Sequence, residues 1–137
     1  MTDLRVLKTQ KAVQTAFVDL LYEKEFKDIS VQEICDKALV NRNTFYKYYS
    51  GKSGLAGKMI AEFRQDYAAL LNKRLAARDV RAVMREIMPE LYEKRRILLA
   101  LWRIETRRHR LFQEMQGLLR QAFLAQAAAK FPGRDKN

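Results

Sequence analysis

Apolar residues recur every three or four positions along most of the chain, which places them on one face of a helix. The pattern predicts helices over residues 9–22, 30–38, 42–48, 53–75, 79–91, 97–104 and 111–126. Pro89 falls inside the fifth of these and is expected to interrupt it by a kink or a new start. Strand-like alternation is scarce, and 137 residues contain two prolines and five glycines. The fold class is therefore expected to be all-α.

Residues 30–49 read as two short helices joined by a tight turn. Ser30 and Glu33 have the spacing of a capping box, in which each side chain bonds the backbone N–H of the other residue. The helical pattern breaks at Leu39 and Val40, and Asn41 is a strong N-cap residue that restarts it. Two helices in this arrangement form a helical hairpin, which many proteins use for packing alone.

The second helix of this hairpin has two unlike faces. Phe45 and Tyr49 are expected to point inward and pack against the preceding helices. The other side chains can donate to DNA: Arg suits a guanine edge, Asn suits adenine, and Thr, Tyr and Lys commonly contact phosphate. They are Arg42, Asn43, Thr44, Tyr46, Lys47 and Tyr48. By composition alone, this helix fits either a DNA-reading helix or an aromatic-rich packing face.

The order of residues within 9–60 resembles the DNA-binding segment of the TetR/AcrR family of bacterial transcriptional regulators. The matching motifs are Ser30-Val31-Gln32-Glu33-Ile34, Thr44-Phe45-Tyr46-Lys47-Tyr48-Tyr49 and Lys52-Ser53-Gly54-Leu55. The resemblance implies a homeodomain-like helix-turn-helix head of three helices, a linking fourth helix and a small helical C-terminal domain. We expect the boundary between residues 1–52 and 53–137. Lys52 inherits a phosphate contact from the family pattern.

Two positions depart from that pattern. Leu39 stands where the family usually has glycine, so a turn that needs a positive φ would be strained there. Asn41 replaces a serine or threonine and is equivalent as a cap. Family members are also typically some fifty or more residues longer, so the chain is read as a short or C-terminally truncated member. The nearest substitute for the usual dimer-forming helices is the face from Leu111 to Phe123.

The resemblance implies a repressor that binds a palindromic DNA operator as a homodimer. An alternative is an interaction protein or coactivator that acts through a protein partner on its basic C-terminal domain. Base edges are assigned to Arg42 and Asn43, with Lys47 on a base or a phosphate. The DNA backbone is assigned to Thr44, Tyr46, Tyr48 and Lys52, and Gln32 is a weaker phosphate or base candidate.

A small apolar effector is a further expectation of this resemblance. The side chains that could line its pocket are Met84, Met88, Trp102 and Met115. Core packing is the alternative for each of the four, because about sixty residues leave little interior for a ligand.

The formal net charge of +11 is unevenly distributed. Residues 1–60 hold ten Lys or Arg against seven Asp or Glu, and residues 61–137 hold seventeen against nine. Arginines are densest between Arg95 and Arg110. This basic stretch is either a solvated surface or a second contact for DNA phosphate, an acidic partner or an anionic effector.

Other functional classes find little support in the sequence. No nucleophile is visibly paired with a base, and His109 stands among arginines that disfavour its protonation. We expect no enzymatic activity, no cofactor and no metal site. Cys35 is expected to be a buried, inert thiol rather than a redox sensor. No apolar stretch has the length of a membrane span, so the expected location is the cytoplasm.

Overall fold

The computed structural model describes residues 3–75 and 79–130, and all of its regular elements are helical. The predicted all-α class is confirmed. In chain order the elements are α1 (Leu4–Glu23), the short 3₁₀ helix η1 (Phe26–Asp28), α2 (Val31–Ala38), α3 (Arg42–Tyr48), α4 (Lys52–Leu75), α5 (Val80–Glu93), α6 (Arg95–Trp102) and α7 (Leu111–Lys130).

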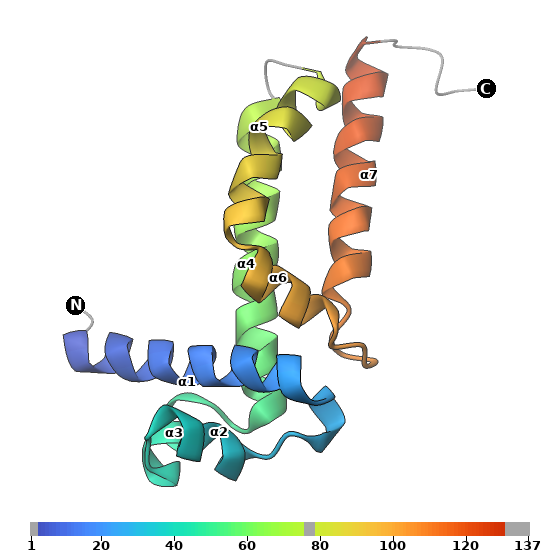
Figure 1. Ribbon diagram of the computed structural model, residues 1–137. Coiled ribbons are helices and arrows are strands. Elements are labelled where there is room, and N and C mark those ends of the chain that lie inside the picture. The colour runs from blue at the N-terminus through green and yellow to red at the C-terminus, as the bar shows by residue number, and fades with distance from the viewer. Residues whose placement is uncertain (1–2, 76–78, 131–137) are drawn as a thin grey trace.

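The first three α-helices form a head at one end of the molecule. Figure 1 shows α1 lying across the foot of α4, with α2 and α3 beneath it. Val13, Phe17 and Leu21 recur on one face of α1 and are all buried, because this face covers the hairpin of α2 and α3. Ile29 and Ile34 are buried with them, and the half-buried Phe26 packs against the same cluster.

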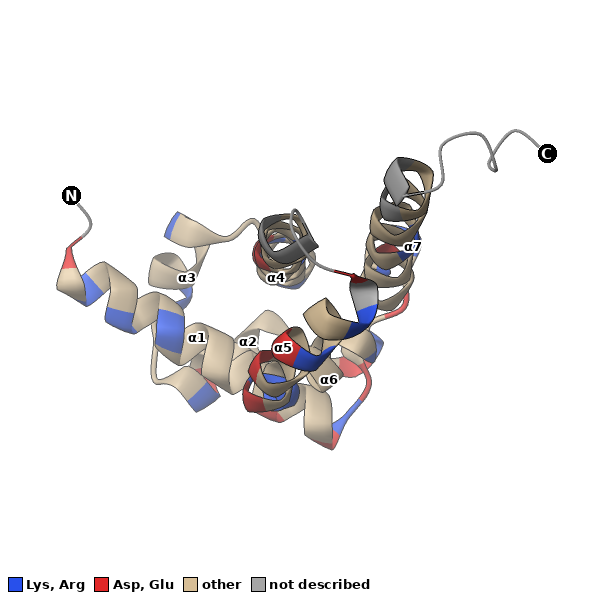
Figure 2. Cartoon of the chain, turned by 90° about the horizontal axis from the view of Figure 1, so that it is seen from above, with Lys and Arg blue, Asp and Glu red and all other residues tan. Residues whose placement is uncertain are grey.

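The long helix α4 joins this head to the C-terminal helices. Its first turns bury Leu55, Ala56 and Met59 in the head, and its later turns bury Tyr67 and Leu71 beside α5, α6 and α7. The buried apolar side chains therefore form one continuous cluster along α4 from Leu55 to Leu71. Seen from above, α7 and the free end of α1 lie at opposite sides of the molecule (Figure 2). The division at residue 52 remains a prediction.

Several predicted helix boundaries differ from the structure, and among them α6 spans 95–102 rather than 97–104. α1 begins at Leu4 rather than near Thr9, because Asp3 caps it by accepting a hydrogen bond of 3.0 Å from the N–H of Arg5. α4 begins at Lys52, so Ser53 lies inside the first turn and does not cap it. α5 passes through Pro89 without interruption, and Pro89 is exposed, so the carbonyl that loses its donor is on the solvent side.

The turn between α2 and α3 is strained at Leu39. Its φ of 58° and ψ of 44° are left-handed, and it is the one residue other than glycine with a positive φ in the described chain. The N–H groups of Leu39 and Val40 bond the carbonyls of Asp36 and Cys35, which is the Schellman ending that normally uses glycine. The turn thus has the positive φ that would strain a leucine, and the leucine side chain gains no burial in return, since it is 92% exposed.

Candidate nucleic-acid interface

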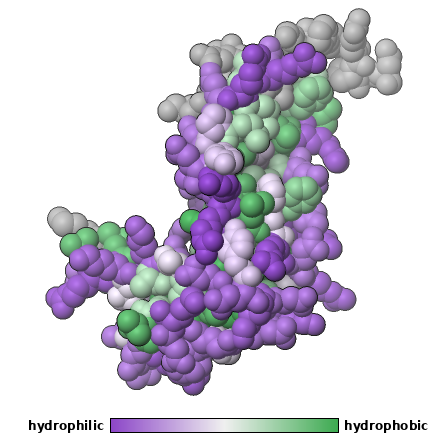
Figure 3. Space-filling view, in the orientation of Figure 1, coloured by the Kyte–Doolittle hydropathy of each residue, from purple (hydrophilic) through white to green (hydrophobic). Residues whose placement is uncertain are grey.

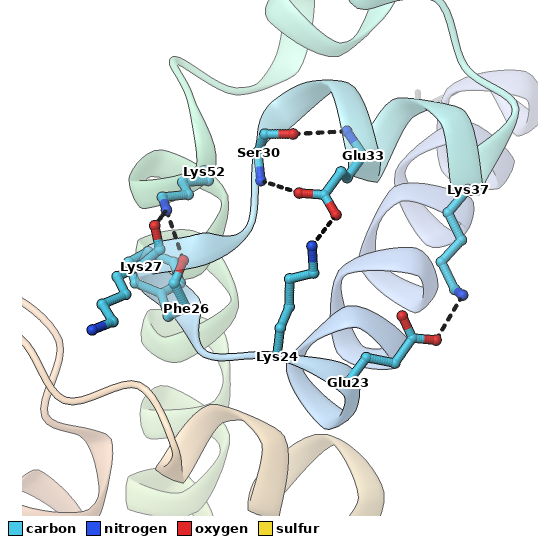
Figure 4. Close-up of polar contacts among 8 residues, drawn as sticks. All are labelled: Glu23, Lys24, Phe26, Lys27, Ser30, Glu33, Lys37 and Lys52. Atoms are coloured by element: carbon cyan, nitrogen blue, oxygen red, sulfur yellow. Dashed lines mark hydrogen bonds and ion pairs between the residues drawn. The ribbon is translucent and has the colours of Figure 1, made fainter.

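Local capping bonds define where α2 and α3 begin. The N–H of Glu33 bonds the Ser30 hydroxyl at 3.1 Å and the N–H of Ser30 bonds the Glu33 carboxylate at 3.1 Å, so the predicted capping box is confirmed (Figure 4). Lys24 also bonds this carboxylate, and that bond is the first cause of the lowered pKa of Glu33. Asn41 caps α3 as predicted, because its side chain accepts from the N–H of Asn43 at 2.7 Å.

α3 presents two unlike faces. Phe45 and Tyr49 are buried and their rings lie 5.4 Å apart between centroids, which confirms the predicted inward face. The opposite face exposes Arg42, Asn43, Tyr46 and Lys47. The Arg42 guanidinium lies 6.0 Å from the centroid of the Tyr46 ring. α3 is therefore anchored by aromatic packing while a row of polar side chains remains open.

The other predicted contact residues differ in how free they are. Thr44 and Tyr48 are half-buried at the edges of the exposed face, and Tyr48 packs partly against the core. Gln32 is exposed on α2, and its amide donates to the Asp36 carboxylate at 2.7 Å. Contact of any of these three residues with DNA remains a prediction.

Lys52 has a different environment from the other predicted contacts. Its ammonium donates to the carbonyl oxygens of Phe26 and Lys27, at 2.6 and 3.1 Å, and lies 4.7 Å from the centroid of the Phe26 ring (Figure 4). These bonds tie the first turn of α4 to η1, the segment that leads into α2. Lys52 thus positions the hairpin, with one of its three N–H donors left over.

The loop between α6 and α7 reaches the same junction, which the sequence did not indicate. His109 is buried there, and its Nε2 lies 3.0 Å from the Ser53 hydroxyl in a hydrogen bond. Its ring meets the Phe26 ring edge-on, with 6.4 Å between centroids. A Cβ on Gly57 would lie 3.3 Å from His109 Cε1, so α4 and the loop pack closely at this glycine. A glycine inside the helical pattern of residues 53–75 is the one feature of the sequence that could have pointed to a close contact here.

Burial shifts the pKa of two side chains near the head, downward for His109 and upward for Cys35. Desolvation is the first cause that lowers the pKa of His109, and the neighbouring Arg108 charge adds to it. Desolvation also raises the pKa of the Cys35 thiol, which is free and buried. The predicted burial of Cys35 is therefore confirmed, and its thiol stays protonated at neutral pH.

An apolar cavity of about 430 Å³ lies among the C-terminal helices. Met84, Met88, Trp102 and Met115, the four side chains considered for a pocket, all line it. Figure 3 shows hydrophobic surface gathered between α5 and α7, where this cavity lies. Trp102 and Phe112 form an edge-on ring pair at its margin, 5.0 Å apart between centroids. The cavity is within the size range of small-ligand sites.

The described residues show neither a metal site nor a membrane span. Residues 3–75 and 79–130 contain no cluster of three or more His, Cys, Asp or Glu side chains with the geometry of a metal site. None of the described helices is both long and apolar enough to cross a membrane.

The capped hairpin, the tight turn and the open polar face of α3 define a helix-turn-helix domain. Comparison with known proteins agrees: the family model described as "Bacterial regulatory proteins, tetR family" matches residues 15–59. Residues 15–59 therefore match the DNA-binding domain of TetR-family regulators, and the resemblance seen in the sequence is confirmed over this segment.

Three curated relatives each match part of the chain. An uncharacterized HTH-type transcriptional regulator of Bacillus subtilis, YxbF, is 41% identical over 59 residues, which are 42% of this chain and 16% of YxbF. The dhaKLM operon transcriptional activator DhaS of Lactococcus lactis is 36% identical over 64 residues, 47% of this chain and 33% of DhaS. YdeS of Bacillus subtilis, another uncharacterized HTH-type regulator, is 40% identical over 47 residues, 34% of this chain and 24% of YdeS. The match thus spans between about a sixth and a third of each relative.

Proposed function

We propose that this chain regulates transcription by binding a specific DNA sequence through α3. The open polar face of α3 is the observation that carries the proposal. Arg42, Asn43 and Lys47 are exposed, and in the described chain none of the three forms a side-chain hydrogen bond or an ion pair. A short helix with free donors on its outer face suits the major groove, where base edges present distinct acceptor patterns.

The contacts divide into those that read bases and those that hold the backbone. Arg42 and Asn43 read base edges, and Lys47 shares that duty or binds phosphate. Thr44, Tyr46 and Tyr48 bind phosphate, as does Gln32 if its amide leaves Asp36. For Lys52 we propose mainly a positioning role, since its ammonium bonds the carbonyls of η1, and its remaining donor can reach a phosphate.

A homodimer through α7 is the second part of the proposal. Phe123 and Leu124 are more than half exposed, and Phe112 is 39% exposed on the same helix. Twenty residues of α7 contain only three charged side chains, Glu114, Arg120 and Lys130. Although Gln113, Gln116, Arg120 and Gln121 are exposed on this helix as well, its exposed large apolar side chains favour a partner, and a second copy supplies the same surface. Two heads about 34–36 Å apart would read a palindromic operator in successive major grooves.

The apolar cavity supports a small apolar effector as the signal for this regulator. Its lining is formed by methionine, leucine and aromatic side chains from α4 to α7, with Arg95 and Gln116 as the polar exceptions besides the tyrosines. We propose repression of transcription in the cytoplasm as the outcome. The activator named among the relatives makes activation the direct competitor.

Selection of genomic DNA fragments by the purified chain, at near-physiological salt, tests the first part. The expected result is enrichment of one inverted-repeat sequence, and the mass in solution is expected to equal two chains. Enrichment that is independent of sequence would contradict reading by α3. A reporter gene placed behind the selected operator, assayed with and without the protein, then distinguishes repression from activation.

A further inference from the structure

The head alone offers few free cations for DNA. Residues 1–60 contain ten Lys or Arg against seven Asp or Glu, although phosphate attraction supplies much of the affinity of DNA-binding proteins. Several of these cations are already engaged inside the protein. Lys24 pairs with Glu33, Lys37 pairs with Glu23 at 3.2 Å, Lys52 bonds two carbonyls, and Lys58 bonds the carbonyl of Tyr48 at 2.7 Å.

The loop between α6 and α7, in contrast, carries positive charges that are free. Arg107, Arg108 and Arg110 are all exposed, and none of them has an ion pair within the described ranges. Figure 2 shows this loop with basic residues along it, at the lower right of the view. Three unpaired guanidinium groups within four residues form a strong local positive charge, and guanidinium is well suited to phosphate.

Although it lies late in the chain, the loop is attached to the head. The buried His109 stands between these arginines and holds the loop against Ser53 on α4 and the Phe26 ring on η1. The loop is also ordered by its own bonds. The Thr106 hydroxyl accepts from the N–H groups of Arg108 and His109, at 3.2 and 3.0 Å, and the N–H of Thr106 donates to the His109 carbonyl at 3.1 Å.

This attachment places the arginines beside the segment that enters α2. Phe26, which His109 contacts, is followed directly by Lys27, and the Lys27 side chain is exposed and points away from Lys52 (Figure 4). η1 leads into α2 through Ile29 and Ser30, so the loop lies next to the segment that enters the helix-turn-helix.

From this arrangement we infer that the α6–α7 loop is a second DNA-binding element. Arg107, Arg108 and Arg110 bind phosphates of the duplex beyond the base pairs that α3 reads. The inference rests on the proposed function and adds a flanking contact to it. An acidic protein would also suit such a charge, but the anchoring of the loop to the head through His109 favours the DNA that the head binds.

The test compares binding of two duplexes over a series of salt concentrations, by fluorescence anisotropy. One duplex is the selected operator, and the other carries about one further helical turn on each side. The loop variant combines Arg107→Gln, Arg108→Gln and Arg110→Gln. The matched control combines Arg81→Gln, Arg85→Gln and Lys94→Gln, which removes the same charge from exposed positions on α5 and at its C-cap.

On the extended duplex, we expect the loop variant to bind roughly ten-fold more weakly at about 0.1 M salt. Its plot of log affinity against log salt should be shallower by about 0.9 for each phosphate that the loop no longer neutralises. On the short duplex the loop variant should match the wild-type chain, and the control should match it on both.

An unchanged slope for the loop variant on the extended duplex would overturn the inference while leaving reading by α3 intact. An equal loss in the control would overturn it as well, because net charge alone would then account for the effect. If the wild-type chain bound neither duplex, the proposed function and this inference would both fail.

Discussion

α3 and α7 are both incompletely covered by the rest of the chain, but they expose opposite kinds of side chain. α3 buries its aromatic residues and leaves arginine, asparagine and lysine open. α7 buries Leu111 and Met115 near its start and leaves Phe123 and Leu124 open further along. Polar donors remain stable in water until DNA replaces it, whereas an exposed apolar face favours burial against protein. The two surfaces therefore indicate two kinds of partner.

The largest effect is expected from the inward face of α3. Phe45→Ala should lower the free energy of unfolding by about 3–5 kcal/mol, because the ring is fully buried and its loss leaves a cavity. Urea denaturation followed by circular dichroism measures the change. Tyr46→Ala, on the outer face, is the control and should change stability far less. A small effect of Phe45→Ala would mean that α3 is not anchored by its aromatic residues.

Next in size is the effect of charge on the outer face of α7. Phe123→Asp combined with Leu124→Asp should separate the proposed dimer, because two exposed apolar residues become charged on the face proposed for the contact between copies. Losing the second head should weaken binding of a palindromic operator by roughly 100-fold. Analytical ultracentrifugation and binding assays check both results. A variant that stays dimeric would locate the contact elsewhere.

A smaller loss is expected from the side of α3 that is proposed to read bases. Arg42→Ala should reduce operator affinity by about 1–3 kcal/mol and relax the preference at one base pair, since a bidentate guanine contact carries about that much discrimination. Tyr46→Phe should instead weaken binding to all sequences alike, as removal of a phosphate contact does. Competition assays on operator variants measure these preferences. If both changes altered specificity in the same way, the division of roles would be wrong.

Substitution of Leu39 by glycine at the turn between α2 and α3 should make the protein more stable. Leu39→Gly should raise the free energy of unfolding by about 1 kcal/mol, because glycine adopts a positive φ without the clash of a Cβ. Leu39→Ala keeps the strain and removes only an exposed side chain, so it should be close to neutral. The denaturation midpoints of the two variants separate these cases. Equal stabilities would show that the backbone at this turn is not strained.

The smallest expected effect is a pH dependence from His109. Burial lowers the pKa of His109 in the folded chain, so the unfolded chain binds the proton more readily. Stability should therefore fall as the pH drops below about 6.5, the ordinary histidine value. His109→Gln should remove this loss of stability. The slope of the free energy of unfolding against pH should change by no more than the binding of one proton allows. Glu33, whose pKa is lowered from 4.5, acts in a separate and more acidic range.

Much of the fold was predictable because its signals are local. The α2 capping box and the Asn41 cap join residues two or three positions apart, so spacing in the sequence was sufficient to find them. Helical periodicity likewise identified the buried faces of α1 and α3. The errors at Thr9, Ser53 and Pro89 concern where helices begin or break. Asp3 starts α1 earlier than predicted, α4 begins at Lys52, and the exposed Pro89 does not interrupt α5.

The helices, the TetR-type head and the two faces of α3 follow from residue order alone, since each depends on residue type and on neighbours within a turn or two. The internal bonds of Lys52 and the position of the arginine loop beside the head became visible only in the folded chain. Those outcomes depend on contacts such as Ser53 with His109, which are 56 residues apart. Distances of that kind follow from how the helices pack, and no local pattern contains them.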